Sequence, residues 1–176
     1  KKKICLIHSK EINYKKDSFR NRRILKAFNN IDQVVANSQF TKNLAIENGV
    51  NSNKIKVINP GVYPVKPIDK SSLEEAENFL KGKNPRIITV SRFDKRKNHE
   101  KVIMAIRNLK EIYPNIVYTC IGYGDEEESL KRLVIELKLE NHVIFLKEIP
   151  NDLKNALVAK SNIFIMPSII HKNSVE

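Results

Sequence analysis

From residue 85 onward, short apolar runs alternate with segments whose apolar residues recur at helical spacing. The runs have the length and continuous hydrophobicity of strands buried on both faces. They span 85–91, 116–121, 142–146 and 163–166. Helices are predicted from Asn98, a suitable N-cap, to a stop at Pro114, from Asp125 through Leu137, and over 152–160. This alternation predicts an α/β fold: a Rossmann-like parallel sheet with helices on both faces.

The pattern before residue 66 is weaker. Strands are predicted at 4–7, 31–36 and 55–58, with a basic helix over 18–30 and a second helix from Ser38 to a C′ glycine, Gly49. The turn-rich stretch 59–64 predicts a domain boundary, and a polar helix follows over 69–82. Because isolated strand pairs are marginal in water, we expect too little sheet here for a proper independent core.

We therefore interpret residues 1–66 as the last part of an N-terminal α/β domain and its linker. Residues 67–176 would be a second, incomplete α/β domain. The chain lacks an initiator Met, and no helix after residue 166 covers the last predicted strand. Both ends therefore look cut.

Composition is that of a soluble globular protein, with 41% hydrophobic and 30% charged residues. The net charge of +12 is uneven: residues 1–66 hold 14 lysines and arginines against 4 acidic residues, and the remainder holds 18 against 16. A nucleic-acid binder would interleave its basic stripe with aromatic residues, and few lie here, so we predict no nucleic-acid partner. Cys5 and Cys120 lie in strand-like runs, which suits buried, reduced thiols in the cytoplasm, and a disulfide between them is the less favoured alternative.

The basic excess includes Arg20, Arg22, Arg23 and Lys26 of the helix over 18–30. A solvated helix face is the favoured interpretation. The alternative is peripheral contact with an anionic membrane, which would place the protein at the inner face of that membrane.

The sharpest candidate site follows the run at 85–91. Four cations, Arg92, Lys95, Arg96 and Lys97, crowd one turn between the carboxyl end of a strand and the start of a helix. Ligands of open α/β sheets bind at this edge, and helix N-termini attract anions. The cations could hold a diphosphate without a metal ion. The competing interpretation is a solvated basic loop.

Two other features are ambiguous. Gly122 and Gly124 flank Tyr123, but the third glycine of a dinucleotide-binding fingerprint would stand at position 127, which is Glu127. A tight turn is therefore the favoured interpretation, and it could still bring a ligand close to the backbone. His8 follows the first strand and, by itself, is more often structural than functional. The four histidines and two cysteines show no metal-ligand spacing, and we predict no metal site.

Several motifs then occur in an order that resembles retaining glycosyltransferases of family four, also called group 1, which have the GT-B fold. They are Ala36 to Lys42, Lys56 to Val62, Val90 to Phe93 with Lys97-Asn98, Ile121 to Gly124, Val143 to Leu146, and Ile165 to Ser168. The resemblance covers nearly the whole chain. It implies that residues 67–176 belong to the nucleotide-sugar donor-binding domain, and that 1–66 lie on the acceptor side.

The resemblance also assigns roles. Arg92 and Lys97 match the cationic pair that holds the donor diphosphate, and Gly122, Gly124, Lys147, Glu148 and Ile149 fall where the family meets the donor and its nucleobase. His8 matches a histidine near the transferred sugar and the acceptor. Glu176 matches the first glutamate of a two-glutamate motif, the one that faces the donor sugar, and both residues are catalytic candidates.

The implied activity is transfer of a sugar, with retention, from a UDP- or GDP-sugar to a lipid-linked or polysaccharide acceptor, without a metal or other cofactor. The chain alone is expected to bind nucleotide weakly and to show no turnover. The alternative is a non-catalytic nucleotide-binding α/β module.

Overall fold

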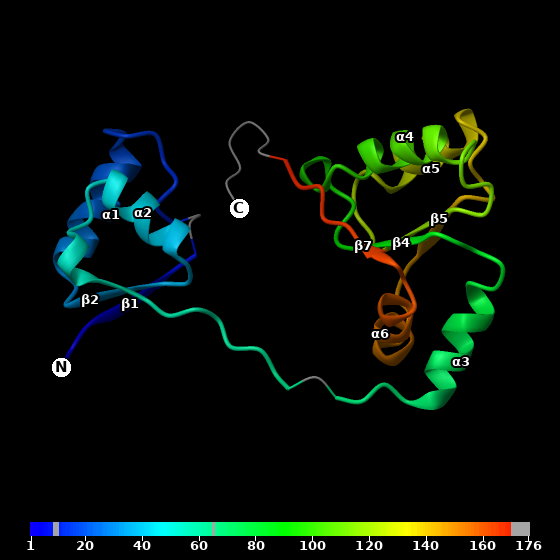
Figure 1. Ribbon diagram of the computed structural model, residues 1–176. Coiled ribbons are helices and arrows are strands. Elements are labelled where there is room, and N and C mark those ends of the chain that lie inside the picture. Colours follow the sequence, from blue (N-terminus) through cyan, green and yellow to red (C-terminus); the bar gives the residue numbers. More distant parts are fainter. Residues whose placement is uncertain (9–10, 65, 170–176) are drawn as a thin grey trace. The chain divides into compact units, whose positions relative to one another are not determined.

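The computed structural model describes residues 1–8, 11–64 and 66–169 (Figure 1). The chain forms two compact units, which meet in sequence at Pro64. Each unit contains its own parallel sheet and its own buried core.

The first unit is built on a three-stranded parallel sheet in the order β1-β2-β3. Its elements are β1 (Ile4–Ile7), α1 (Phe19–Asn29), β2 (Gln33–Ala36), α2 (Gln39–Glu47), a 3-10 turn η1 (Ser52–Lys54) and β3 (Ile55–Val57). Serine hydroxyls cap both helices: Ser18 accepts from the Asn21 N–H and Ser38 from the Thr41 N–H. Gly49, with φ of 96°, follows α2 as predicted.

The expectation that this part lacks a core was wrong. The third strand completes a small sheet, and apolar residues from all three strands and both helices are buried together. They are Ile7, Ile12, Phe28, Val34, Ala36, Ala45, Val50 and Ile55. Three strands with a covered face bury much more apolar surface than an isolated pair.

The second unit has a four-stranded sheet in the order β6-β5-β4-β7, and all pairs are parallel. Its elements are α3 (Lys70–Phe79), β4 (Arg86–Val90), a 3-10 turn η2 (Lys95–Lys97), α4 (His99–Leu109), β5 (Val117–Ile121), α5 (Glu127–Glu136), β6 (Val143–Leu146), α6 (Asn151–Ala159) and β7 (Ile163–Phe164). Helices α4 and α5 cover one face of this sheet, and α3 and α6 cover the other (Figure 1). The Rossmann-like parallel fold is confirmed.

Two predicted elements are shorter than expected. The run at 163–166 forms only β7, because the Ile165 N–H still bonds Ile88 but the Ile165 carbonyl accepts the Thr89 hydroxyl, and Pro167 has no N–H to donate. Ile163 and Phe164 are also half exposed, since this strand pairs with β4 alone among the described strands.

Helix α4 ends at Leu109, before the predicted stop at Pro114. The N–H groups of Ile112 and Tyr113 both bond the Leu109 carbonyl, and a residue before proline avoids the helical conformation. At the other end, Asn98 does not cap the helix with its side chain. Its backbone is left-handed, with φ of 56°, and its amide donates to the Pro167 carbonyl at 3.2 Å.

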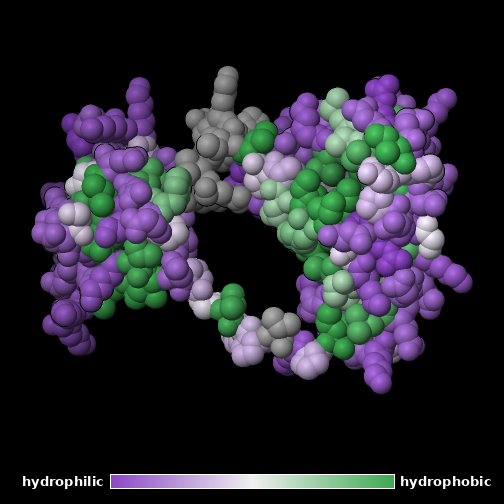
Figure 2. Space-filling view, viewed as in Figure 1, coloured by the Kyte–Doolittle hydropathy of each residue, from purple (hydrophilic) through white to green (hydrophobic). Residues whose placement is uncertain are grey.

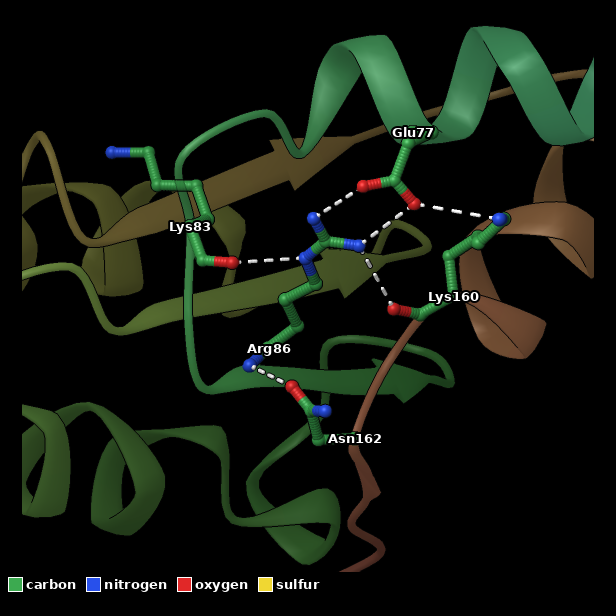
Figure 3. Close-up of polar contacts among 5 residues, drawn as sticks. All are labelled: Glu77, Lys83, Arg86, Lys160 and Asn162. Atoms are coloured by element: carbon green, nitrogen blue, oxygen red, sulfur yellow. Dashed lines mark hydrogen bonds and ion pairs between the residues drawn. The ribbon is translucent and has the colours of Figure 1, made fainter.

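A partly buried cation, Arg86, makes several hydrogen bonds at the amino end of β4 (Figure 3). The Arg86 guanidinium donates to both Glu77 oxygens at 2.7 and 3.1 Å, and also to the Lys83 carbonyl at 2.9 Å. The Lys160 ammonium lies 3.4 Å from Glu77, and the Arg86 N–H donates to the Asn162 side chain at 2.7 Å. These contacts join α3, β4 and the end of α6 at the end of the sheet opposite the carboxyl ends of its strands.

Candidate functional site

The loops that follow β4, β5 and β6 lie together at the carboxyl edge of the second sheet. Backbone hydrogen bonds join them: the Ser91 N–H donates to Ile121 at 3.0 Å, Phe93 to Tyr123 at 2.9 Å, and Gly122 to Leu146 at 2.9 Å. The edge where open α/β sheets bind ligands is therefore a connected surface.

An open pocket of about 260 Å³ lies at this edge. It is lined by Val90, Ser91, Arg92, Ile121, Gly122, Tyr123, Glu148, Ile149 and Lys154. Four residues that the sequence singled out for donor binding, Arg92, Gly122, Glu148 and Ile149, are thus brought together although up to 57 positions separate them.

Three other donor candidates are placed elsewhere. Lys97 is half buried at the end of η2, and Gly124 packs on the backbone of Phe93. The Lys147 ammonium lies 5.7 Å from the centre of the Tyr123 ring, a cation–π contact that links the loops after β5 and β6. Lys147 therefore supports a pocket residue from outside the lining.

Asp94 organises the basic segment, and the sequence did not single it out. Its carboxylate accepts the Lys97 N–H at 3.1 Å and so caps η2. It also lies 3.4 Å from the Arg92 guanidinium and 3.9 Å from that of Arg96. Arg92 remains 70% exposed, so its positive charge is held in place yet open to a ligand, whereas Arg96 is 14% exposed.

The two glycines after β5 are required by protein packing. Gly122 has φ of 148°, and a Cβ there would collide with the Ser91 carbonyl oxygen. A Cβ on Gly124 would collide with the backbone of Phe93. Phe93 itself is buried and packs edge-on against His99 and Phe145, with ring centres 4.9 and 5.8 Å apart. The tight-turn interpretation is therefore the structural reason for both glycines, and Gly122 lines the pocket as well.

A chain of hydrogen bonds runs through the core behind the pocket. The Ser91 hydroxyl lies 3.0 Å from His99 Nε2, and His99 Nδ1 lies 2.9 Å from the Tyr118 hydroxyl. Tyr118 donates to Thr89 at 2.9 Å, and Thr89 donates to the Ile165 carbonyl at 2.7 Å. Burial lowers the pKa of His99 and raises that of Tyr118.

The catalytic candidates fall outside this pocket. His8 is exposed at the end of β1 in the first unit, where its N–H donates to Glu11 at 3.0 Å. Glu176 lies outside the described residues. Their catalytic roles remain predictions.

A second hollow, of about 380 Å³, lies beside α4 and α5. Its lining includes the carboxylates of Asp94, Glu100 and Glu126 together with the ammonium groups of Lys95 and Lys101. The three carboxylates of this hollow would repel a diphosphate, whereas the pocket at Arg92 has two cationic side chains and one carboxylate in its lining.

Within the described ranges, no group of three or more histidine, cysteine or acidic side chains could hold a metal ion. The same residues include no helix of the length and apolarity needed to cross a bilayer.

Helix α1 displays the basic residues noted in the sequence. The Arg20 guanidinium lies 5.9 Å from the Tyr14 ring centre, and that of Arg23 lies 5.7 Å from the ring of Phe19, which is 71% exposed. Hydrophilic residues cover most of the visible face of this unit (Figure 2).

The chain has two α/β units, each built on a sheet of parallel strands, and one unit has a pocket at the carboxyl ends of its strands. This is the architecture of GT-B glycosyltransferases. The chain belongs to the family described as glycosyl transferases group 1, which matches residues 71–172. Residues 1–66 match the family described as glycosyltransferase family 4. The predicted family is confirmed.

Curated relatives agree with this assignment. An uncharacterized glycosyltransferase of Methanocaldococcus jannaschii is 32% identical over 146 residues, which are 80% of this chain and 36% of that protein. The GDP-mannose-dependent alpha-(1-6)-phosphatidylinositol monomannoside mannosyltransferase of Mycolicibacterium smegmatis is 26% identical over 79% of this chain and 37% of its own length. The chain thus spans little more than a third of these relatives.

Solved structures share the fold. HepE of Anabaena in complex with UDP matches with a TM-score of 0.75 and 21% identity, over 93% of this chain and 46% of that one. A glycosyltransferase from Rickettsia africae matches with a TM-score of 0.70 and 26% identity, over 93% and 45%.

Proposed function

We propose that the whole protein transfers a sugar from a nucleoside diphosphate sugar to an acceptor, with retention of configuration, and that the pocket at Arg92 holds the nucleotide part of the donor. The observation that carries this proposal is the convergence of Arg92, Gly122, Glu148 and Ile149 on one pocket in a group 1 glycosyltransferase chain.

The charges of the pocket suit the proposed chemistry. When the bond between sugar and diphosphate breaks, negative charge grows on the leaving diphosphate. The exposed Arg92 guanidinium, which contacts Asp94, can stabilise that negative charge without reorganising. Such electrostatic stabilisation is commonly the largest contribution to catalysis. Arg92 would supply this positive charge from the pocket, and Lys97, which lies outside the lining but donates its N–H to the same Asp94, would add to it. We therefore propose a reaction that needs no metal ion.

The apolar part of the pocket suits a nucleobase. Val90, Ile121 and Ile149 offer apolar surface, and Tyr123 adds an aromatic ring at 57% exposure. A mostly apolar site with a few polar groups is typical of a cofactor or nucleotide pocket. The relative from Mycolicibacterium smegmatis is named for GDP-mannose, and HepE was crystallised with UDP and UDP-glucose. Both bases are therefore candidates for this chain.

The acceptor proposed here is a glycan or a lipid-linked saccharide. Its support comes from relatives: the mycobacterial one is named for a phosphatidylinositol mannoside, and one from Erwinia amylovora, 29% identical over 132 residues, is named for amylovoran biosynthesis. Peripheral contact of α1 with an anionic membrane belongs to this proposal and would place the enzyme near such an acceptor at the inner face.

The test is calorimetric titration of the chain with UDP and with GDP. We expect saturable binding to one of them and a loss of at least about tenfold in affinity in the Arg92→Ala, Lys97→Ala double variant, since charge-assisted contacts to phosphate are strong. A matched control removes two cations from the far end of α4, in Arg107→Ala with Lys110→Ala, and should bind as the unchanged chain does.

Equal binding by both double variants would remove Arg92 and Lys97 from the site. Binding also fits the alternative, a non-catalytic nucleotide-binding module. Transfer of sugar from the preferred donor by the full-length gene product decides between the two, because a binding module would show affinity without turnover.

A further inference from the structure

The hydrogen-bonded chain behind the pocket has no part in the proposed diphosphate contacts, yet one of its ends lines the pocket. Ser91 belongs to the lining, and His99, Tyr118 and Thr89 are each no more than 2% exposed. Buried polar chains of this kind specify a single arrangement when every member is satisfied.

The order of donors in the chain can be worked out from its far end. The Ile165 carbonyl can only accept, so Thr89 donates its proton there and must accept from Tyr118. Tyr118 has then used its proton, so its oxygen accepts from His99, and Nδ1 of His99 must carry a hydrogen. In a neutral imidazole this leaves Nε2 as an acceptor, and the Ser91 hydroxyl donates to it.

The Ser91 hydroxyl has a competing acceptor. It lies 3.0 Å from His99 Nε2 and 3.2 Å from the carbonyl oxygen of Arg92. One hydroxyl hydrogen cannot serve both contacts fully. The acceptor atom on His99 therefore decides which of the two contacts the Ser91 hydroxyl makes. Because Arg92 directly follows Ser91 in the chain, this choice affects the backbone that carries the Arg92 side chain.

We propose that His99 is a positioning residue of the donor site: Tyr118 fixes its tautomer, its Nε2 accepts the Ser91 hydroxyl, and this contact sets the Ser91-Arg92 segment for binding a nucleoside diphosphate. The inference rests on the proposed function for the identity of the ligand, but the internal geometry stands on its own contacts.

The surroundings favour the neutral form of His99. Burial lowers its pKa most, and Lys97 acts in the same direction, whereas the Arg92 carbonyl, which would accept from the charged ring, and the charge of Asp94 act against them. The aromatic ring of Phe93 packs edge-on against the imidazole, and this contact restricts the orientation of the imidazole ring as well. Both packing and hydrogen bonds therefore fix His99 against the loop that follows β4.

The first test needs no ligand. Nitrogen-15 shifts of the His99 imidazole, measured in the chain at pH 7, should show a neutral ring protonated on Nδ1. A ring protonated on Nε2, or an imidazolium, would overturn the proposal. Tyr118→Phe keeps the aromatic ring and removes the hydroxyl, and it should convert the signal to a mixture of tautomers.

The second test compares variants at position 99. His99→Asn can reach Tyr118 but offers no acceptor at the position of Nε2, whereas the longer side chain in His99→Gln restores one. We expect His99→Asn to lower affinity for the preferred nucleotide about five- to tenfold and His99→Gln to recover most of it. A purely structural histidine predicts that both variants lose thermal stability and that neither ranks this way in affinity.

A double-mutant cycle with Ser91→Ala gives the decisive comparison, because coupled residues are not additive. Ser91→Ala, His99→Asn and the double variant should lose affinity to the same extent, and independent, additive losses would contradict the proposal. The control is His142→Asn: this half-buried histidine contacts the Ile116 carbonyl at 3.0 Å, near the opposite ends of the strands, and its loss should leave affinity unchanged.

Failure of the proposed function would look different. If the unchanged chain binds neither UDP nor GDP, the donor assignment falls, and the amide resonances of Ser91 and Arg92 decide the positioning role. They should shift in His99→Asn and stay in place in His142→Asn. Unchanged resonances in both variants would remove the positioning role as well.

Discussion

The pocket depends at the level of single residues on backbone atoms that approach one another closely. Gly122 has a conformation that residues with a side chain rarely adopt, and a Cβ at this position would collide with the Ser91 carbonyl oxygen. Any side chain there must push the loop after β5 away from the loop that carries Arg92.

Gly122→Ala should therefore destabilise the second unit by about 2–4 kcal/mol, because backbone strain and a steric clash add. Chemical denaturation measures the loss. Gly82→Ala is the matched control: Gly82 also has a positive φ, of 73°, but no atom lies within 4 Å of a Cβ there, so only about 1 kcal/mol of strain is expected. Equal losses in the two variants would show that close packing at Gly122 contributes nothing.

Sequence reasoning found the charged and glycine positions of the site more readily than their partners. Arg92 stood out by residue type and by resemblance, and Glu148 by resemblance alone. Asp94 was hidden inside a basic run, and its role became visible only once its oxygens were placed against Lys97 and Arg92. Lys154 comes from a helix far along the chain, and only the folded sheet brings it to the pocket.

At the level of elements, the order of strands and helices in the second unit follows directly from the hydrophobic pattern. The ends were harder to predict, because they depend on individual hydrogen bonds. Strand β7 ends where the Thr89 hydroxyl donates a hydrogen bond to the Ile165 carbonyl, and α4 ends where two N–H groups donate to the Leu109 carbonyl. Neither event leaves a mark on hydrophobic periodicity.

The contact of α3 with β4 through Glu77 and Arg86 predicts a pH dependence (Figure 3). Hydrogen bonds from Arg86 lower the pKa of Glu77 from 4.5 to about 2. A lowered folded-state pKa adds stability that is fully present above the unfolded value of 4.5 and is lost as the pH falls towards about 2.

Glu77→Gln should therefore melt at a lower temperature at pH 7 and lose less additional stability than the unchanged chain between pH 4.5 and 2. Thermal unfolding followed across this range tests the expectation. Glu75→Gln removes an exposed carboxylate of the same helix and serves as the control. Parallel acid profiles for Glu77→Gln and the unchanged chain would contradict a native-state role for the ion pair.

At the level of the whole molecule, the two units differ in charge more than in architecture. Residues 1–66 carry 14 basic and 4 acidic residues, while the second unit is close to balanced. Four of these basic residues lie on α1, and the guanidinium groups of two of them lie over aromatic rings. Such a face can attract an anionic surface, and the attraction must weaken with salt.

Sedimentation with vesicles tests this surface. We expect weak co-sedimentation with phosphatidylglycerol vesicles at low salt, its loss at high salt, and none with phosphatidylcholine. Arg20→Gln with Arg23→Gln should abolish it, whereas Lys70→Gln with Lys81→Gln, a matched charge loss on the second unit, should not. No sedimentation at any salt concentration would leave α1 as a solvated helix face.

The segment between the two sheets has a further consequence. From Ile58 to Pro64 it forms neither helix nor strand, and Val62 and Tyr63 are 93% and 95% exposed. Since each core is built on its own side of this segment, a sequence joined here to a related partner would disturb neither. On the proposed assignment, recombination between family members at this segment would exchange the donor-binding unit separately from the acceptor-side unit.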